Sequence, residues 1–192
     1  MVYTGLVAGN RKQQILDIAA VLFAERGFHG VSVHDIGAAC GISGPALYKH
    51  FSGKDEILAR SLTTISEQLL TTGRSRAAAA STADDALTAL IDWHIDFALG
   101  HPAFIVIQER EWANLDAEER KEVRALQLAY IDVWVDTVRL LRPDLGQPEA
   151  RAAVQATFGL LNSTPHSARI SEGRMRELLQ GLALGALARR SS

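Results

Sequence analysis

The chain has 192 residues and a formal net charge of −2 at pH 7, and 47% of its residues are hydrophobic. A chain of this length can bury a sizeable core without covalent staples. Its single cysteine, Cys40, excludes an intrachain disulfide and a cysteine-based zinc site. The near-neutral balance argues against strong non-specific binding to nucleic acid.

No apolar run approaches the roughly 20 residues of a membrane span. The start of the chain lacks a basic stretch followed by an apolar segment, so we predict no signal peptide and expect a cytoplasmic protein. Only 6% of the residues are aromatic. This composition favours an Ala- and Leu-rich helical core over a β-sandwich. The fold class that we predict is all-α, with about nine helices.

The first predicted helix covers residues 11–25. Apolar residues recur along it at i, i+3, i+4, i+7 and i+8, the spacing of a helix that packs one face on a core. They are Ile15, Ile18, Ala19, Leu22 and Phe23.

Two short helices are predicted next, separated by a glycine turn. Ser32 is a suitable N-cap, with Asp35 three positions on as its capping-box partner. Gly41 falls where the first short helix must end, because glycine adopts the left-handed conformation at low cost. Ser43 is the N-cap of the second helix, and Pro45 is tolerated in its first turn. Two capped helices joined by a tight turn predict a helix-turn-helix, which places its second helix in the major groove of DNA.

The exposed face of this second helix is expected to contact DNA. Leu47 and Phe51 face inward, which leaves Tyr48, Lys49 and His50 outside. These side chains can donate to phosphate oxygens or to base edges, and small residues before them let the backbone approach the bases. The alternative is a buried helical pair with a solvated polar face. The predicted DNA-binding residues are Arg11, Lys12, Ser32, Ser43, Gly44, Pro45, Ala46, Tyr48, Lys49, His50 and Lys54.

The charge of this segment is only weakly positive. Residues 1–60 hold six Lys and Arg against five Asp and Glu. However, no acidic residue lies between Ile36 and Lys54, so the expected DNA-facing edge is locally positive. We therefore expect a modest dependence of DNA binding on salt.

At these residues the chain resembles the TetR family of one-component regulators. The resemblance covers about residues 11–60 and departs from the family pattern at Gly37, where Ala is usual, and at residues 44–45. It implies a homodimer that binds a palindromic operator and responds to a small molecule. The matching segments are Arg-Gly-Phe at 26–28, the capped helix at 32–38, Gly-Ile-Ser at 41–43, Leu-Tyr-Lys-His-Phe at 47–51 and Lys-Asp-Glu-Ile-Leu at 54–58.

The rest of the chain is predicted as further helices with no convincing strand. Residues 73–82 are expected to be a loop or a frayed helix end, and residues 162–170 a loop. Pro102 is expected at the first position of a helix. The predicted helices cover residues 54–72, 82–99, 102 onward, 116–141, 148–161 and 171–188.

Aromatic residues concentrate in the central helices, together with a few polar groups. An apolar cavity with a few convergent polar groups is typical of a small-molecule site. The alternative for any one of these rings is ordinary core packing. The predicted ligand-binding residues are Trp93, Phe97, Phe104, Gln108, Trp112, Tyr130, Trp134, Phe158 and Asn162. His94 and His101, seven apart, lack the spacing of helical metal ligands, and we predict no metal and no cofactor.

The last two helices are predicted to form a homodimer interface. The final helix is too apolar all round for a surface helix, and Gly181 and Gly185 lie four apart on it. A bundle of four helices from two subunits would cover it, as in TetR-family dimers. The alternative is packing within one chain.

These observations predict a DNA-binding domain at residues 1–58 and a ligand-binding and dimerisation domain at residues 59–192. The function that we expect is a repressor that a small hydrophobic ligand releases from its operator. An acyl-CoA or lipophilic carboxylate is one class of ligand, and a drug-like or other hydrophobic compound is another. The alternatives are a ligand-independent DNA binder or activator, and an enzyme. No catalytic triad, phosphate loop or paired-carboxylate signature supports the last.

Overall fold

The computed structural model describes residues 11–188, and no strand occurs among them. This confirms the predicted all-α class. Nine α-helices of five or more residues lie in this range, beside one four-residue helix, α9, and one 3₁₀ turn, η1. The elements are α1 (Arg11–Arg26), α2 (Val33–Ala39), α3 (Gly44–Tyr48), α4 (Lys54–Ala79), α5 (Ala83–Gly100), α6 (Pro102–Arg110), η1 (Trp112–Asn114), α7 (Ala117–Leu141), α8 (Gln147–Leu161), α9 (Thr164–Ser167) and α10 (Glu172–Leu187). The predicted absence of a signal peptide concerns residues 1–10, which lie outside the described part.

The caps of α2 and α3 form as the sequence predicts. Oγ of Ser32 accepts from the Asp35 amide at 3.1 Å, and the Asp35 carboxylate accepts from the Ser32 amide at 2.8 Å. Ser43 Oγ accepts from the amide of Ala46, which fixes the start of α3. Gly41 has a φ of 67°, the left-handed conformation that the turn requires. The helix-turn-helix is therefore set by local hydrogen bonds.

The fourth helix is longer than predicted. It continues through Gly73 to Ala79, where we expected a loop or a frayed end from residue 73. Gly73 is buried, and a Cβ placed on it would lie 2.5 Å from Cε2 of Tyr130 on α7. Glycine is thus required here for close packing between α4 and α7, and the alanines that follow favour helix.

A sharp bend separates α5 from α6 at the predicted break. Helix α5 ends at Gly100 and α6 begins at Pro102, with 82° between the helices. Among the residues described, no single helix is long and apolar enough to cross a membrane. The bent α5–α6 pair reaches that length and composition only when both helices are taken together.

One segment near the C-terminus differs from the prediction. Part of the segment expected as a loop forms α9, where the Thr164 hydroxyl donates to the carbonyl of Ala98 at 2.7 Å and ties α9 to α5. This contact is tertiary, so local sequence patterns do not report it. At the start of α10, Ser171 occupies the N-cap position but makes no capping hydrogen bond through its side chain.

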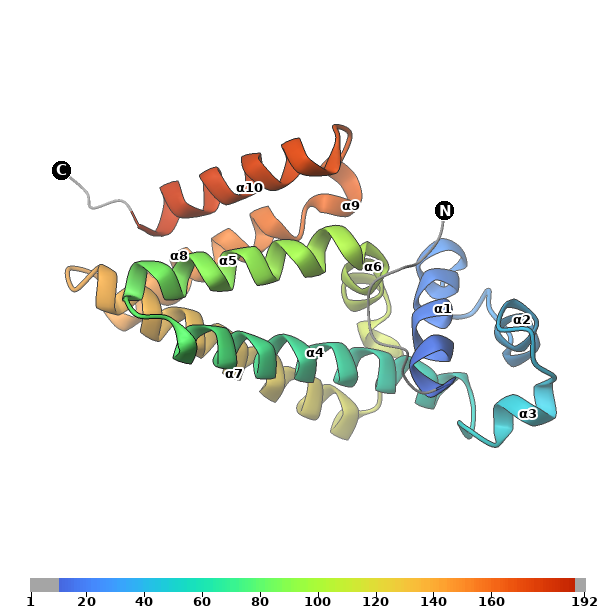
Figure 1. The fold of residues 1–192 in the computed structure, drawn as a ribbon. Coiled ribbons are helices and arrows are strands. Elements are labelled where there is room, and N and C mark those ends of the chain that lie inside the picture. Colours follow the sequence, from blue (N-terminus) through green and yellow to red (C-terminus); the bar gives the residue numbers. More distant parts are fainter. Residues whose placement is uncertain (1–10, 189–192) are drawn as a thin grey trace.

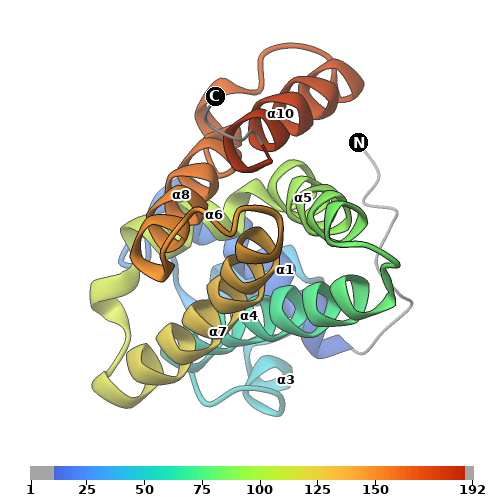
Figure 2. The same cartoon turned by 90° about the vertical axis from the view of Figure 1, so that its left-hand side faces the viewer.

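The arrangement in space joins a small helical unit to a larger bundle. In Figure 1, α1–α3 lie together at one end, and α4 runs from them along α7 into the bundle. Figure 2 shows α10 at the outer edge of that bundle, where it packs on α5 and α8. The predicted boundary at residue 58 falls inside α4, so one continuous helix connects the two ends of the molecule.

Candidate nucleic-acid interface and ligand site

The exposed side of α3 carries the polar residues that the sequence places there. Leu47 and Phe51 are buried, whereas the Tyr48 side chain is 57% exposed and Lys49 is also exposed. His50 is half-buried at the end of this surface. These groups are available to a ligand that approaches α3 from solvent.

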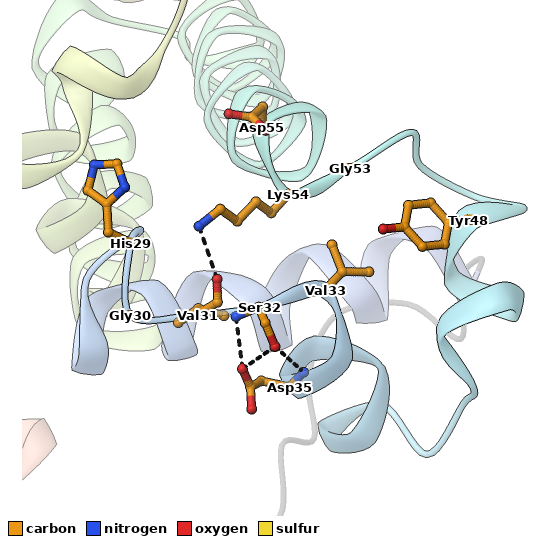
Figure 3. Close-up of a pocket in the computed structure, with 10 residues that line it drawn as sticks. All are labelled: His29, Gly30, Val31, Ser32, Val33, Asp35, Tyr48, Gly53, Lys54 and Asp55. Atoms are coloured by element: carbon orange, nitrogen blue, oxygen red, sulfur yellow. Dashed lines mark hydrogen bonds between the residues drawn. The ribbon is translucent and has the colours of Figure 1, made fainter.

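An open hollow of about 490 Å³ lies beside α3. The turn before α2 and the start of α4 form its walls, and Tyr48 reaches it from α3 and Lys54 from α4 (Figure 3). Ser32 and Asp35 line its floor, and hydrogen bonds from Ser32 lower the pKa of the Asp35 carboxyl below its usual range. The hollow thus combines the hydroxyls of Ser32 and Tyr48 and the ammonium of Lys54 with the carboxylates of Asp35 and Asp55.

Lys54 has a structural role that sequence reasoning missed. Its ammonium donates to the carbonyls of Phe28 at 2.9 Å and Val31 at 3.1 Å, and it lies 4.3 Å from the centre of the Phe28 ring. Both carbonyls lie in the turn after α1, and that of Phe28 also accepts from the Val31 amide at 3.4 Å. Lys54 therefore ties the turn between α1 and α2 to the first residue of α4 with two of its three donors.

Arg11 is also engaged within the chain. Its guanidinium donates to the carbonyl of Cys40 at the end of α2 and to the side chain of Gln14. Lys12 is exposed. Cys40 is buried, which raises the pKa of its thiol, so this cysteine behaves as a packing residue.

Five of the nine predicted ligand-binding residues gather around one buried histidine, His94 of α5. Phe158 stacks on His94 with 4.6 Å between ring centres. The rings of Phe97, Tyr130 and Trp134 lie 5.6 to 5.9 Å away, and Oδ1 of Asn162 lies 3.0 Å from Nε2 of His94. We call His94, Phe97, Tyr130, Trp134, Phe158 and Asn162 the aromatic cluster.

The other four predicted ligand residues lie outside the aromatic cluster. Trp93 donates from its indole to the carbonyl of Leu69 and packs against Arg76. Phe104 lines a crevice elsewhere, Gln108 is half-buried on α6, and Trp112 is half-buried in η1. Composition indicated that aromatic residues concentrate in this region, but it could not show which helix face each one occupies.

Several buried polar atoms near the cluster lack partners among the described residues. They are Nδ1 of His94, Nε2 of Gln127, the hydroxyl of Tyr130 and Nε1 of Trp134. Burial lowers the pKa of His94 to about 4, against a smaller opposing effect of its hydrogen bond with Asn162, so the ring is neutral at pH 7. Burial raises the pKa of Tyr130. The nearby Trp134 opposes that shift, although the two side chains form no hydrogen bond of normal geometry.

A crevice of about 470 Å³ lies at the junction of α1 with the α5–α6 bend and α9. Among the predicted ligand residues, Phe104 alone lines it. Asp17 and Glu25 of α1 and His101 of the bend contribute polar groups. Neither this crevice nor the hollow beside α3 is lined by Trp112 or Tyr130.

Helix α10 exposes apolar side chains on its outer face. Leu178 and Leu182 are 49% and 48% exposed, and a Cβ on Gly181 or Gly185 would meet nothing within 4 Å. Within residues 11–188, no group of three or more His, Cys, Asp or Glu side chains could hold a metal ion.

A capped helix-turn-helix joined through one helix to an all-helical bundle is the architecture of a DNA-binding transcriptional regulator. Two family models agree with this class. One, described as "Bacterial regulatory proteins, tetR family", matches residues 15–60, and another, "Tetracyclin repressor-like, C-terminal domain", matches residues 80–166.

Individual proteins and structures extend the similarity along the chain. The chain is 30% identical over 157 residues to the HTH-type transcriptional repressor KstR2 of Rhodococcus jostii (strain RHA1). The matched region covers 80% of this chain and 76% of that protein. The structure of a TetR-family regulator from Bordetella parapertussis 12822 has a TM-score of 0.80 at 26% identity and covers 95% of this chain and 99% of that one. AibR, solved with isovaleryl coenzyme A and operator DNA, has a TM-score of 0.73 at 22% identity, with coverage of 94% and 100%. The chain belongs to the TetR family of transcriptional regulators.

Proposed function

We propose that this protein is a ligand-responsive repressor that binds a palindromic operator as a homodimer. The observation that carries the proposal is the continuity of α4. This helix begins at Lys54, which holds the turn before the helix-turn-helix, and it contacts the aromatic cluster through Gly73 and Tyr130. A change at the cluster therefore has a direct mechanical path to α3.

On the DNA side, α3 would enter the major groove. Tyr48 and Lys49 are exposed for phosphate or base contacts, and Gly44, Pro45 and Ala46 allow close approach of the helix start. Arg11, Ser32, Ser43 and Lys54 also make the internal hydrogen bonds described above. Their predicted contacts with DNA must use the hydrogen-bonding positions that these internal bonds do not occupy. Lys12 and His50 complete the proposed interface.

On the ligand side, we place the site at the aromatic cluster. Its rings come from α5, α7 and α8 and surround neutral polar groups, which suits an apolar molecule with few polar atoms. KstR2 is named a repressor, and the solved AibR complex contains an acyl-CoA with operator DNA. These names support repression and an acyl-CoA or other hydrophobic ligand for this chain.

The mechanism follows from a population shift. A ligand bound at the cluster would favour one position of α4 and thereby change the spacing of the two α3 helices in a dimer. The ligand can lower operator affinity by no more than the ratio of its own affinities for the DNA-incompetent and DNA-competent states. We propose residues 1–58 and 59–192 as the two functional domains, with the cytoplasm as the place where the operator is read.

A ligand-independent DNA binder or an activator is the second candidate. One observation favours it: the rings of the aromatic cluster pack directly against one another, and neither hollow described above reaches them. A regulator with a permanently packed core would bind DNA without an effector.

The proposal is tested by binding to duplex DNA from the region upstream of the protein's own gene. We expect sequence-specific binding that Tyr48→Ala and Lys49→Ala weaken. Arg174→Ala, which removes a basic side chain from the distant helix α10, should leave it unchanged. Equal affinity of the wild type for this DNA and for a random duplex would contradict the proposal.

A further inference from the structure

The face of α7 that points into the bundle carries a row of unpaired hydrogen-bond donors. Gln127, Tyr130 and Trp134 are spaced by three and four residues, so they lie on one side of the helix. Nε2 of Gln127, the hydroxyl of Tyr130 and Nε1 of Trp134 are all buried and find no partner among the described residues. Buried polar groups in native proteins are nearly always paired, so such a row indicates a missing partner.

Few hydrogen-bond acceptors lie opposite these three side chains. His94 on α5 lies 5.9 Å from the rings of both Tyr130 and Trp134. Because Oδ1 of Asn162 accepts from Nε2 of His94, the neutral ring keeps its lone pair on Nδ1. An indole N–H and an amide N–H only donate, and the Tyr130 hydroxyl is the one group of the row that can also accept. The site therefore offers more donors than acceptors.

The site carries no formal charge of its own. Burial keeps His94 neutral and Tyr130 protonated at pH 7. Arg76 of α4 is near enough to influence Tyr130, but its guanidinium is paired with Asp96 at 3.6 Å and lies over the Trp93 ring. A carboxylate placed among these rings would be buried without a free counter-charge, which is strongly unfavourable.

We infer that the aromatic cluster binds an apolar molecule through a neutral oxygen acceptor, such as a ketone, ester or thioester carbonyl or an alcohol, and that it discriminates against free carboxylates. This inference rests on the ligand site of the proposed function and narrows its chemistry. It retains the thioester of an acyl-CoA and excludes the lipophilic carboxylate considered above.

Room for such a ligand can come from Phe158. This ring is only half-buried, unlike Tyr130 and Trp134, and it covers His94 from α8 at 4.6 Å. If Phe158 turns toward solvent, it uncovers the His94 ring and the space beside the α7 donors. The ligand then replaces ring contacts and pairs donors that the closed cluster leaves unpaired.

The test compares ligands that share a ten-carbon chain. Calorimetric titration of the full-length protein at pH 7.5 with 2-decanone, 1-decanol and decanoate should show at least tenfold tighter binding of the two neutral compounds. Tyr130→Phe and Trp134→Phe each remove one donor and should weaken 2-decanone binding several-fold. Gln155→Leu, which removes an exposed amide donor from α8, should not.

Two outcomes would overturn the inference. Decanoate binding as tightly as 2-decanone would contradict the neutral-acceptor chemistry and leave the core ligand site in place. Absence of binding by all three compounds would contradict both the inference and the core ligand site. Neither outcome affects the operator-binding assay, which tests the DNA-binding part of the proposed function independently.

Discussion

At the scale of single residues, the Tyr130 hydroxyl is buried without a partner. An unsatisfied buried polar group costs about 1–3 kcal/mol, so its removal should help the unliganded fold. We expect Tyr130→Phe to raise the free energy of unfolding by about 1 kcal/mol in urea titrations. The control, Tyr48→Phe, removes an exposed hydroxyl and should change stability by less than about 0.5 kcal/mol. A loss of stability in Tyr130→Phe would show that the hydroxyl has a structural partner.

His94 makes stability depend on pH in a defined window. Its pKa is about 4 in the folded chain, against an ordinary value of 6.5, because the ring is buried. Between these values the unfolded chain binds a proton that the folded chain does not. The contribution of His94 to the free energy of unfolding is therefore fully present above pH 6.5. It falls by up to about 3 kcal/mol as the pH drops toward 4.

The measurement for His94 is the unfolding free energy at pH 7.5 and at pH 5, for the wild type and for His94→Gln. Burial lowers the pKa of His101 as well, so part of the pH dependence comes from a group that the wild type and the variant share. The difference between the two proteins isolates His94. An identical pH dependence in both would contradict a buried neutral ring at this position.

At the scale of elements, local signals decide the short helices, whereas the extent of α4 and the facing of the aromatic rings depend on tertiary contacts. The caps at Ser32 and Ser43 and the turn at Gly41 were predictable because each depends on residues within four positions. The end of α4 was predicted too early, because a glycine at position 73 is typical of a break, whereas the structure needs it for close packing against Tyr130 on a distant segment. The aromatic cluster was half predictable for the same reason: the ring types are visible in the sequence, and their facing directions are not.

The contact of α4 with α7 gives a direct prediction. Gly73→Ala would place a methyl group 2.5 Å from Tyr130, so the two helices must move apart. We expect a loss of about 1–3 kcal/mol of stability, typical of overpacking. Gly173→Ala on the exposed start of α10 has nothing within 4 Å and should be neutral or slightly stabilising. Equal effects of the two changes in urea titrations would contradict the close packing.

At the scale of the whole molecule, the outer face of α10 is the predicted dimer surface. Leu178 and Leu182 are half-exposed one turn apart. The double variant Leu178→Glu, Leu182→Glu should therefore be monomeric in analytical ultracentrifugation, whereas we expect the wild type to sediment as a dimer. Leu140→Glu changes a side chain that is 75% exposed on α7 and should leave the dimer intact. A wild type that sediments as a monomer would contradict the proposed binding of a palindromic operator by a homodimer.

In the proposed complex, two copies of α3 read two half-sites of one operator. Fluorescence anisotropy can test this arrangement with the operator duplex and with the same duplex carrying five extra base pairs between its half-sites. Half a helical turn of insertion puts the second half-site on the opposite side of the DNA. We predict two chains per operator and a loss of affinity of about a hundredfold or more on insertion, because specific binding exceeds non-specific binding by about 10³ or more. Unchanged affinity after insertion, with one chain per duplex, would contradict the account.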